Sequence, residues 1–525
     1  YSYDEAAEGA YRLGGVVSGP LIADHIAGRL TIETREGRDS VGDFQTILNS
    51  QGQPLEFRSD GDAENAANIE STFVRGKLLI RPTGSESFQA NLIGSYNEGT
   101  TPLFRNQIAG SSGGVDVDDR VPAFPTDYRV VDSETYFLGA DVDYATDKFG
   151  AFELLVGHTN DTFFSNEERS SSGVTFNDSE NTTTTVEGLW RFGDNSSSWN
   201  GIVGLSYANR TTELDALAFV TVPLDLSTDT DAYSVYTDLR YNVSERLELN
   251  FGGRYLSTEQ FRNVVFVLPI ITDETIKDDV FLPQFGARFE LNETQNLSLS
   301  VRRGFGDGAV SFNNATFQPY SYDPEFSWTA EASWKGTFND ERGRFSAVAF
   351  YNDFEDQQVN VLVATTPFNV FEIRNVSESR SYGLEIEGQY DLTDSVAVSA
   401  ALGLIDTEIV EGTGLDDIDG NDFGFDPDYT LQFNANWRPT DRVTLDGSVV
   451  TLPEYFSSAS NNEVTKGGGY TIVNAGGAYD FGRFKARVFV QNLFDELAFS
   501  SRFELVGGGT VLAPRTVGFT LTADF

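Results

Sequence analysis

The sequence lacks cysteine and methionine, and it has few basic residues and few histidines. With 0 Cys among 525 residues, a disulfide framework and a thiolate metal site are excluded. Lys and Arg number 36 against 80 Asp and Glu, for a net charge of -44. This balance argues against nucleic acid as a partner, because basic side chains bind its phosphates. The 2 histidines, His25 and His158, lie far apart in the expected topology, which disfavours a His-based catalytic triad or a two-His metal site.

Long apolar runs are also missing. No stretch approaches the roughly 18 to 20 apolar residues that a membrane-spanning helix needs. A membrane protein without such a run must be a closed β-barrel, since only closure satisfies every backbone N–H and C=O group in lipid. The absence of these runs therefore indicates which membrane architecture to test.

The pattern that is present has a period of two residues. In the last segment Val517, Phe519, Leu521, Ala523 and Phe525 alternate with small or polar residues. Similar alternation runs through 88–96, 328–335 and 382–390. Such strands present one face to lipid and the other to a polar lumen. The sequence thus predicts an all-β fold, a transmembrane antiparallel β-barrel that occupies residues 1–525 as one domain.

Short and long connections alternate along the chain. Ten connections are short and polar, with aromatic residues beside many of them: 18–25, 82–87, 145–149, 193–198, 242–246, 292–296, 338–344, 391–395, 438–442 and 480–483. Longer connections rich in Asp, Asn and Gly lie between them: 103–132, 160–182, 209–230, 353–380 and 406–428. Short periplasmic turns opposite long extracellular loops are the outer-membrane arrangement. We therefore expect a bacterial outer-membrane protein with a periplasmic C-terminus.

The strand count is odd. We count 21 strands, starting at about Tyr11, whereas an antiparallel barrel closes with an even number. One additional strand before Tyr1 would give 22 strands, the number found in plugged transporters. The alternative is a miscount by one strand.

Several segments resemble the barrel of TonB-dependent receptors. The segments that resemble this family are 11–30, 75–83, 301–313 (VRRGFGDGAVSFN), 323–336 (DPEFSWTAEASWKG), 381–388 (SYGLEIEG), 489–496 (FVQNLFDE) and the end from Pro514-Arg515 to Phe525. Asp307, Ala309 and Ala330 depart from the family pattern. The resemblance extends over nearly the whole chain, and the order and spacing of the segments support it.

The resemblance implies a function that the residues alone do not show. Family members import scarce, bulky nutrients, most often ferric siderophores, and are energised through TonB–ExbB–ExbD. They carry an N-terminal plug domain and a TonB-binding segment, neither of which is in this sequence; we expect both upstream of Tyr1. The leading hypothesis is thus an active importer of an iron chelate or similar nutrient. The alternatives are an unplugged passive pore or structural barrel and, less favoured, an outer-membrane enzyme.

A candidate ligand site follows one of these segments. Arg302, Arg303 and Phe305 open a long connection that also contains Phe317, Tyr320 and Tyr322. Arginine binds carboxylates and catecholates, and aromatic rings stack on flat ligands. The alternative is an aromatic girdle with lumen ion pairs from these arginines to Glu325 and Glu331.

Two further features have candidate roles. The run DDIDGND at 416–422 offers Asp417, Asp419 and Asn421 as calcium ligands, although a solvated acidic loop is the alternative. The terminal aromatic Phe525 resembles the recognition signal for the barrel-assembly machinery. We expect no cofactor, and we expect contacts with outer-membrane lipid and lipopolysaccharide.

Overall fold

The structure is a computed structural model, and the placed residues are 2–4, 10–38, 68–84, 87–102, 107–108, 128–169, 173–194, 196–218, 222–266, 271–313, 316, 318–364, 370–412, 418–502 and 509–525. The chain divides into two compact units. The N-terminal unit comprises residues 10–103 and 125–285, and the C-terminal unit comprises residues 1–9, 104–124 and 286–525. Among the placed residues, no helix is long and apolar enough to cross a membrane.

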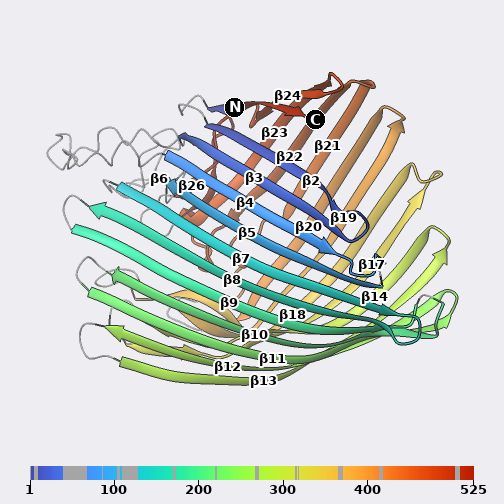
Figure 1. Cartoon of the computed structure of the whole chain (residues 1–525). Coiled ribbons are helices and arrows are strands. Elements are labelled where there is room, and N and C mark those ends of the chain that lie inside the picture. Colours follow the sequence, from blue (N-terminus) through green and yellow to red (C-terminus); the bar gives the residue numbers. More distant parts are fainter. Residues whose placement is uncertain are drawn as a thin grey trace. The chain divides into compact units, whose positions relative to one another are not determined.

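The N-terminal unit is built from antiparallel strands in which each strand pairs with the next (Figure 1). These are β2 (Ala10–Ile22), β3 (Ile26–Arg38), β4 (Asn68–Ile80), β5 (Phe88–Pro102), β7 (Tyr128–Thr146), β8 (Gly150–Arg169), β9 (Gly173–Phe192), β10 (Trp199–Ala218), β11 (Val222–Ser244), β12 (Leu247–Phe266) and β13 (Ile271–Asn292), whose last residues belong to the C-terminal unit.

The C-terminal unit continues the same pattern. Its long strands are β14 (Gln295–Gly306), β17 (Glu325–Phe338), β18 (Gly343–Ala364), β19 (Val370–Thr393), β20 (Val396–Glu411), β21 (Tyr429–Thr440), β22 (Val443–Phe456), β23 (Lys466–Asp480), β24 (Phe484–Gln491) and β27 (Thr516–Ala523). Short elements lie in its connections: β6 (Gln107–Ile108), β15 (Ala309–Phe312), β16 (Pro319–Tyr322), the 3-10 helix η3 (Glu463–Thr465), β25 (Phe499–Arg502) and β26 (Gly509–Val511).

The strand count agrees with the sequence analysis from residue 10 onward. Over the placed residues the main sheet has 22 strands, and all but β1 (Ser2–Asp4) begin at Ala10 or later. β1 pairs antiparallel with β27, with Ser2 opposite Gly518. The structure thus has the additional strand at Ser2–Asp4, after Tyr1, whereas the sequence analysis expected it before Tyr1.

The two faces of the strands differ as the period-two pattern predicts. On one face, which we call the apolar face, large side chains remain exposed, as at Leu138 (64%), Leu205 (60%) and Phe281 (57%). Such exposure is costly in water but favourable in hydrocarbon. The opposite face, the polar face, carries side chains such as Gln89, Asp141 and Arg191.

Aromatic residues border the apolar face at two levels along the strands. At the end with short connections, the turn end, Phe88 lies near Tyr144 and Trp199 near Tyr241, with ring centroids 6.3 and 4.6 Å apart. Toward the end with long connections, the loop end, the ring centroids of Tyr96 and Tyr136 lie 4.9 Å apart, near the middle of β5 and β7. Aromatic pairs at two levels are typical of the two interfaces of a membrane.

The long connections contain more strand than the sequence suggested. The predicted loop 160–182 consists largely of the ends of β8 and β9, and the predicted loop 353–380 consists largely of the ends of β18 and β19. β19 has 24 residues, well beyond the roughly 9 to 11 that a tilted strand needs to span a bilayer. These extensions carry polar side chains, so the sequence predicted loops there. Antiparallel pairing nevertheless continues in water once its register is set.

A small hydrophobic cluster lies in the C-terminal unit. Its buried residues are Val361, Val376, Ile409, Ile418 and Ala459. They come from the ends of β18, β19 and β20 and from two connections. The cluster therefore holds Ile418, which lies in the predicted calcium run, against the loop ends of these strands.

Candidate functional site

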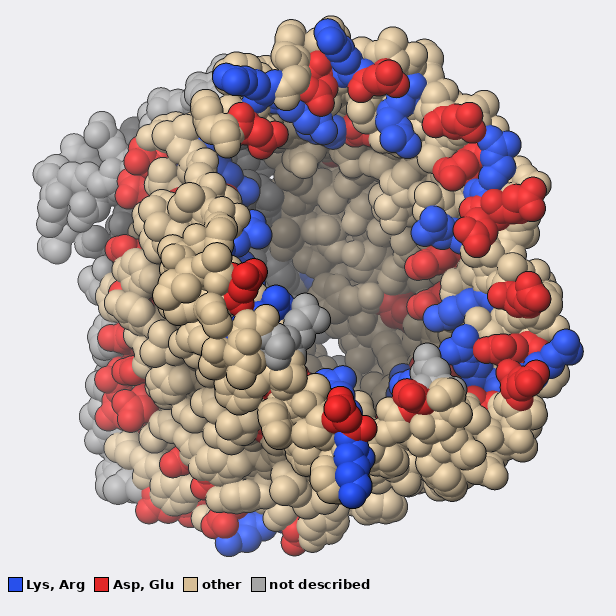
Figure 2. Space-filling model, turned by 45° about the vertical axis from the view of Figure 1, so that its right-hand side comes forward, with Lys and Arg blue, Asp and Glu red and all other residues tan. Residues whose placement is uncertain are grey.

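Ion pairs are spread over the strands of both units. Arg487 and Asp446 form a bidentate pair at 2.5 and 2.8 Å in the C-terminal unit, and Arg12 lies 3.3 Å from Glu33 in the N-terminal unit. Figure 2 shows acidic and basic side chains lying next to one another at many places. Such exposed pairs contribute little stability individually, but they determine which charges remain available to a ligand.

The predicted ligand residues Arg302 and Arg303 lie on opposite faces of β14. Arg302 is on the polar face, where its Nη2 atom lies 2.7 Å from Oε1 of Glu331. Arg303 stacks its guanidinium 4.2 Å from the ring centroid of Phe326, on the other face. Adjacent residues of a strand point in opposite directions, so one ligand cannot contact both guanidinium groups. The Arg302 contact matches the lumen ion pair that the sequence analysis weighed as an alternative.

The aromatic residues of the predicted site are also divided. The ring centroids of Phe305 and Phe326 lie 5.5 Å apart. Phe326 is the ring on which Arg303 stacks. Tyr320 and Tyr322 belong to the β15–β16 hairpin, and the hydroxyl of Tyr320 accepts a hydrogen bond from the N–H of Ile373 at 3.0 Å. Phe317 lies outside the described residues. The hairpin thus packs on β19 and carries its tyrosines to the loop end of the C-terminal unit.

A buried carboxylate at this loop end was missed by the sequence analysis. Glu372 is only 8% exposed. Its Oε1 accepts a hydrogen bond from Asn313 at 2.6 Å, and its Oε2 pairs with Arg374 at 2.8 Å. The Arg374 side chain remains 46% exposed while its guanidinium is paired with Glu372. No pattern in the sequence predicted this contact, since Asn313 and Glu372 are 59 residues apart.

Two of the predicted calcium residues take part in hydrogen bonds, one within their own connection and one to the connection that follows β22. Asp419 accepts from the N–H of Gly412 at 2.7 Å, and the Asn421 amide donates to the carbonyl of Ala459 at 2.9 Å. Asp417 lies outside the described residues. These contacts order Asp419 and Asn421 without a cation, and calcium binding at this run stays a prediction.

Asp422, the last residue of this run, and Asp426 both have a raised pKa. Burial raises the pKa of Asp426 above its ordinary value; the nearby carboxylates, first Asp422, act in the same direction, and a hydrogen bond from Thr407 opposes them. Burial also raises the pKa of Asp422, and Asp428 adds to the effect. A raised carboxyl pKa means that the folded environment disfavours the charged form.

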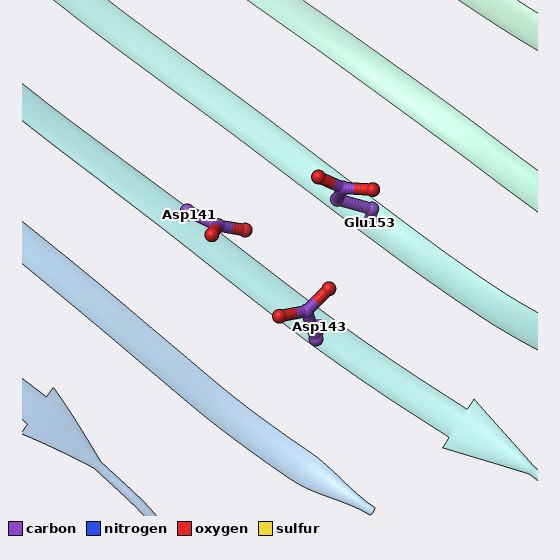
Figure 3. Close-up of side chains that lie close together, drawn as sticks. All are labelled: Asp141, Asp143 and Glu153. Atoms are coloured by element: carbon purple, nitrogen blue, oxygen red, sulfur yellow. The ribbon is translucent and has the colours of Figure 1, made fainter. Parts of the chain in front are cut away.

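Three acidic side chains meet on the polar face of the N-terminal unit. Asp141 and Asp143 of β7 and Glu153 of β8 turn their carboxylates toward one another (Figure 3), with one oxygen of each within 4.8 Å of the others. Asp143 pairs in register with Glu153 across the short β7–β8 turn. The sequence analysis missed this cluster, although the short turn and the i, i+2 spacing of the aspartates were visible signals.

Neighbouring strands supply partners to this acidic cluster. Gln89 donates to Asp143 at 3.0 Å, Asn91 donates to Asp141 at 3.4 Å, and Arg191 binds Glu153 at 2.5 Å. One oxygen of Asp141 is buried and has no partner among the described residues. These contacts neutralise Glu153 and leave the aspartates as the negative part of the cluster.

Comparison with known proteins identifies the family. The sequence profile described as "TonB dependent receptor-like, beta-barrel" matches residues 81–493. The chain belongs to the TonB-dependent receptor family. It is the β-barrel part of an outer-membrane transporter that binds a ligand and interacts with TonB, and members of this family are not enzymes.

Solved structures of TonB-dependent receptors share the fold. The ferric yersiniabactin uptake receptor FyuA from Yersinia pestis superposes with a TM-score of 0.81 at 16% identity, covering 98% of this chain and 78% of that chain. The ferric citrate transporter FecA superposes with a TM-score of 0.77 at 17% identity, covering 98% and 76%. The ferric-catecholate import receptor Fiu from K12 E. coli superposes with a TM-score of 0.73 at 14% identity, covering 99% and 81%. At these identities the similarity establishes the antiparallel barrel fold.

Proposed function

We propose that this TonB-dependent receptor barrel imports a ferric siderophore or a similarly bulky iron chelate. The observation that carries the proposal is the family match over residues 81–493. The solved structures most relevant to the substrate are named as receptors or transporters of ferric yersiniabactin, ferric citrate and ferric catecholates.

A plug domain and a TonB-binding segment preceding Tyr1 complete the proposal. Energy reaches such a barrel through TonB–ExbB–ExbD, and a plug prevents free diffusion through the lumen. A passive pore, the alternative, needs neither part. The two functions therefore differ in whether uptake depends on TonB and in whether small solutes leak through the barrel.

The ligand would bind at the loop end of the C-terminal unit. Arg374 has a partly exposed guanidinium on β19, the strand that Tyr320 contacts through the N–H of Ile373, and Arg302 lies on the polar face of β14. Guanidinium groups bind carboxylates and catecholates through paired hydrogen bonds. Because Arg302 is paired with Glu331 and Arg374 with Glu372, a ligand must compete with these carboxylates or bridge to them.

Uptake of labelled iron by cells that express the complete gene product would test this function. The host would lack its own siderophore receptors and would be compared with the same host without TonB. We expect iron accumulation from at least one class of ferric chelate, and we expect it to stop in the host without TonB.

Conductance of the purified protein in planar bilayers separates the alternatives. An importer closed by its plug passes little current, whereas an open pore shows steady conductance. TonB-independent uptake together with steady conductance would replace the importer with a passive pore.

A further inference from the structure

A hollow lies on the apolar face of the N-terminal unit. It spans β2, β3, β4, β5, β7 and β8 and has a volume of about 900 Å³. Its floor contains two pairs of glycines that lie directly opposite each other on neighbouring strands, Gly19 with Gly28 and Gly76 with Gly94. We call this hollow the lateral groove.

Among the described residues, three of the four floor glycines are open, whereas Gly28 is covered by Leu21 and Leu78, at 3.1 and 3.6 Å from an added Cβ. A Cβ atom added at Gly19 or Gly76 would meet nothing within 4 Å, and one at Gly94 would meet only Leu138, at 3.5 Å. Leu21 and Leu138 line the groove and are 67% and 64% exposed. Such a surface offers water almost no hydrogen bonds, and an empty apolar hollow forfeits dispersion contacts. An apolar occupant is therefore favoured.

The lateral groove lies within the membrane-spanning part of the strands. Aromatic pairs border it at both ends, Phe88 with Tyr144 at the turn end and Tyr96 with Tyr136 toward the loop end. The last lining residue toward the loop end, His158, is eight residues from Gly150 (158 − 150), where β8 begins. With a rise of about 3.3 Å per residue and a tilt of about 45°, His158 lies roughly 19 Å from Gly150 along the membrane normal. Since the apolar band is about 25 Å tall, His158 lies just below the loop-end interface.

His158 supplies a polar group at that end of the groove. Its Nδ1 lies 2.9 Å from Oγ1 of Thr184, and its side chain is exposed. In either neutral tautomer the other ring nitrogen, Nε2, remains able to donate or to accept a hydrogen bond. A polar side chain on a lipid-facing wall is costly unless it finds a partner. An occupant with an ester carbonyl or a hydroxyl at this depth would satisfy Nε2.

We propose that the lateral groove binds one acyl chain of a lipid from the leaflet at the loop end. The chain would run over the paired glycines toward the turn end, and its ester or hydroxyl group would bond to Nε2 of His158. The groove is continuous with the lipid-facing wall of the barrel, so a lipid reaches it directly. Lipid tails and the wall are equally apolar, so the preference comes from close packing and the hydrogen bond.

Native mass spectrometry of the full-length protein in a mild detergent would test the proposal, with dimyristoyl phosphatidylethanolamine as the probe. We expect one lipid per chain to be retained at activation energies that strip all other lipids. Gly76→Leu fills the floor and should weaken retention at least about tenfold, the effect of losing the packing of a few methylene groups. His158→Ala should weaken it about fivefold, the effect of one hydrogen bond.

Gly188→Leu is the matched control. Gly188 lies on the apolar face of β9, opposite Leu154 and Leu205, and a Cβ there also meets nothing within 4 Å. It does not line the groove, so retention should match the wild type. Gly19→Leu is the second groove variant if Gly76→Leu does not fold, as judged by heat-modifiable electrophoretic mobility. Equal retention in the groove and control variants, or a second protein chain in place of the lipid, would overturn the proposal.

Discussion

Arg302 and Glu331 form an ion pair across the neighbouring strands β14 and β17, with Nη2 and Oε1 2.7 Å apart. The pair stands on the polar face, whereas the adjacent Arg303 lies against Phe326 on the other face. The two arginines are adjacent in the sequence but lie on opposite faces of β14. Substitution of each one can therefore distinguish their roles.

Arg302→Ala should weaken binding of an anionic ferric chelate about tenfold, the effect of removing one charge-assisted hydrogen bond. Arg303→Ala should leave binding within about twofold of the wild type, because Arg303 cannot reach a ligand on the polar face. Quenching of tryptophan fluorescence during titration with the chelate would measure both affinities. A larger loss for Arg303→Ala would show that the ligand binds elsewhere.

Gly150→Ala should destabilise the β7–β8 turn. Gly150 has a φ of +79°, and an added Cβ would lie 2.1 Å from the carbonyl oxygen of Arg191, a backbone atom that cannot turn away. Left-handed backbone alone costs about 1 kcal/mol, so we expect a total loss above about 2 kcal/mol. Urea unfolding in detergent would measure it. Gly420→Ala is the control, since Gly420 has the same φ but meets nothing within 4 Å; an equal loss in both would exclude the clash as the cause.

Asp426→Asn should stabilise the 418–428 connection at neutral pH. The pKa of Asp426 is raised mainly by burial, so its folded value exceeds its unfolded value. The cost of the charge is absent below the unfolded pKa and fully present once the pH exceeds the folded pKa. The protection factors of the Phe423 and Phe425 amides, which are corrected for the intrinsic pH dependence of exchange, should therefore rise on acidification in the wild type and depend less on pH in the variant. An unchanged pH profile would assign the effect to another group.

Asp419→Ala should loosen the same connection whether or not calcium is present, because Asp419 holds the N–H of Gly412. Limited proteolysis in calcium and in a chelator would measure the rate of cleavage. Calcium-dependent protection of the wild type, lost in the variant, would instead support the calcium site predicted from Asp417, Asp419 and Asn421.

Deletion of Phe525 should reduce assembly without destabilising the folded barrel. Phe525 is fully exposed beyond the end of β27, so it makes little packing contribution. We expect a several-fold lower amount in the outer membrane of cells and an unchanged urea midpoint for protein refolded in detergent. Phe525→Tyr, which keeps an aromatic terminus, should restore assembly. A lowered urea midpoint would assign a structural role to this residue.

Sequence alone determined the architecture of this protein. Alternation such as that from Val517 to Phe525 specifies a two-faced strand, since successive side chains point in opposite directions. The short polar connections specify which strands pair, and missing apolar runs exclude membrane helices. These are local properties, so neighbouring residues are enough to predict them.

Tertiary structure decided which side chains meet. The contact of Asn313 with Glu372 depends on how a loop hairpin packs on β19, which no local pattern encodes. The separation of Arg302 from Arg303 depends on β14 remaining a regular strand through both residues, where the sequence also allowed a loop. The lateral groove depends on the register that places Gly76 opposite Gly94, because a shift of one residue moves every side chain to the other face.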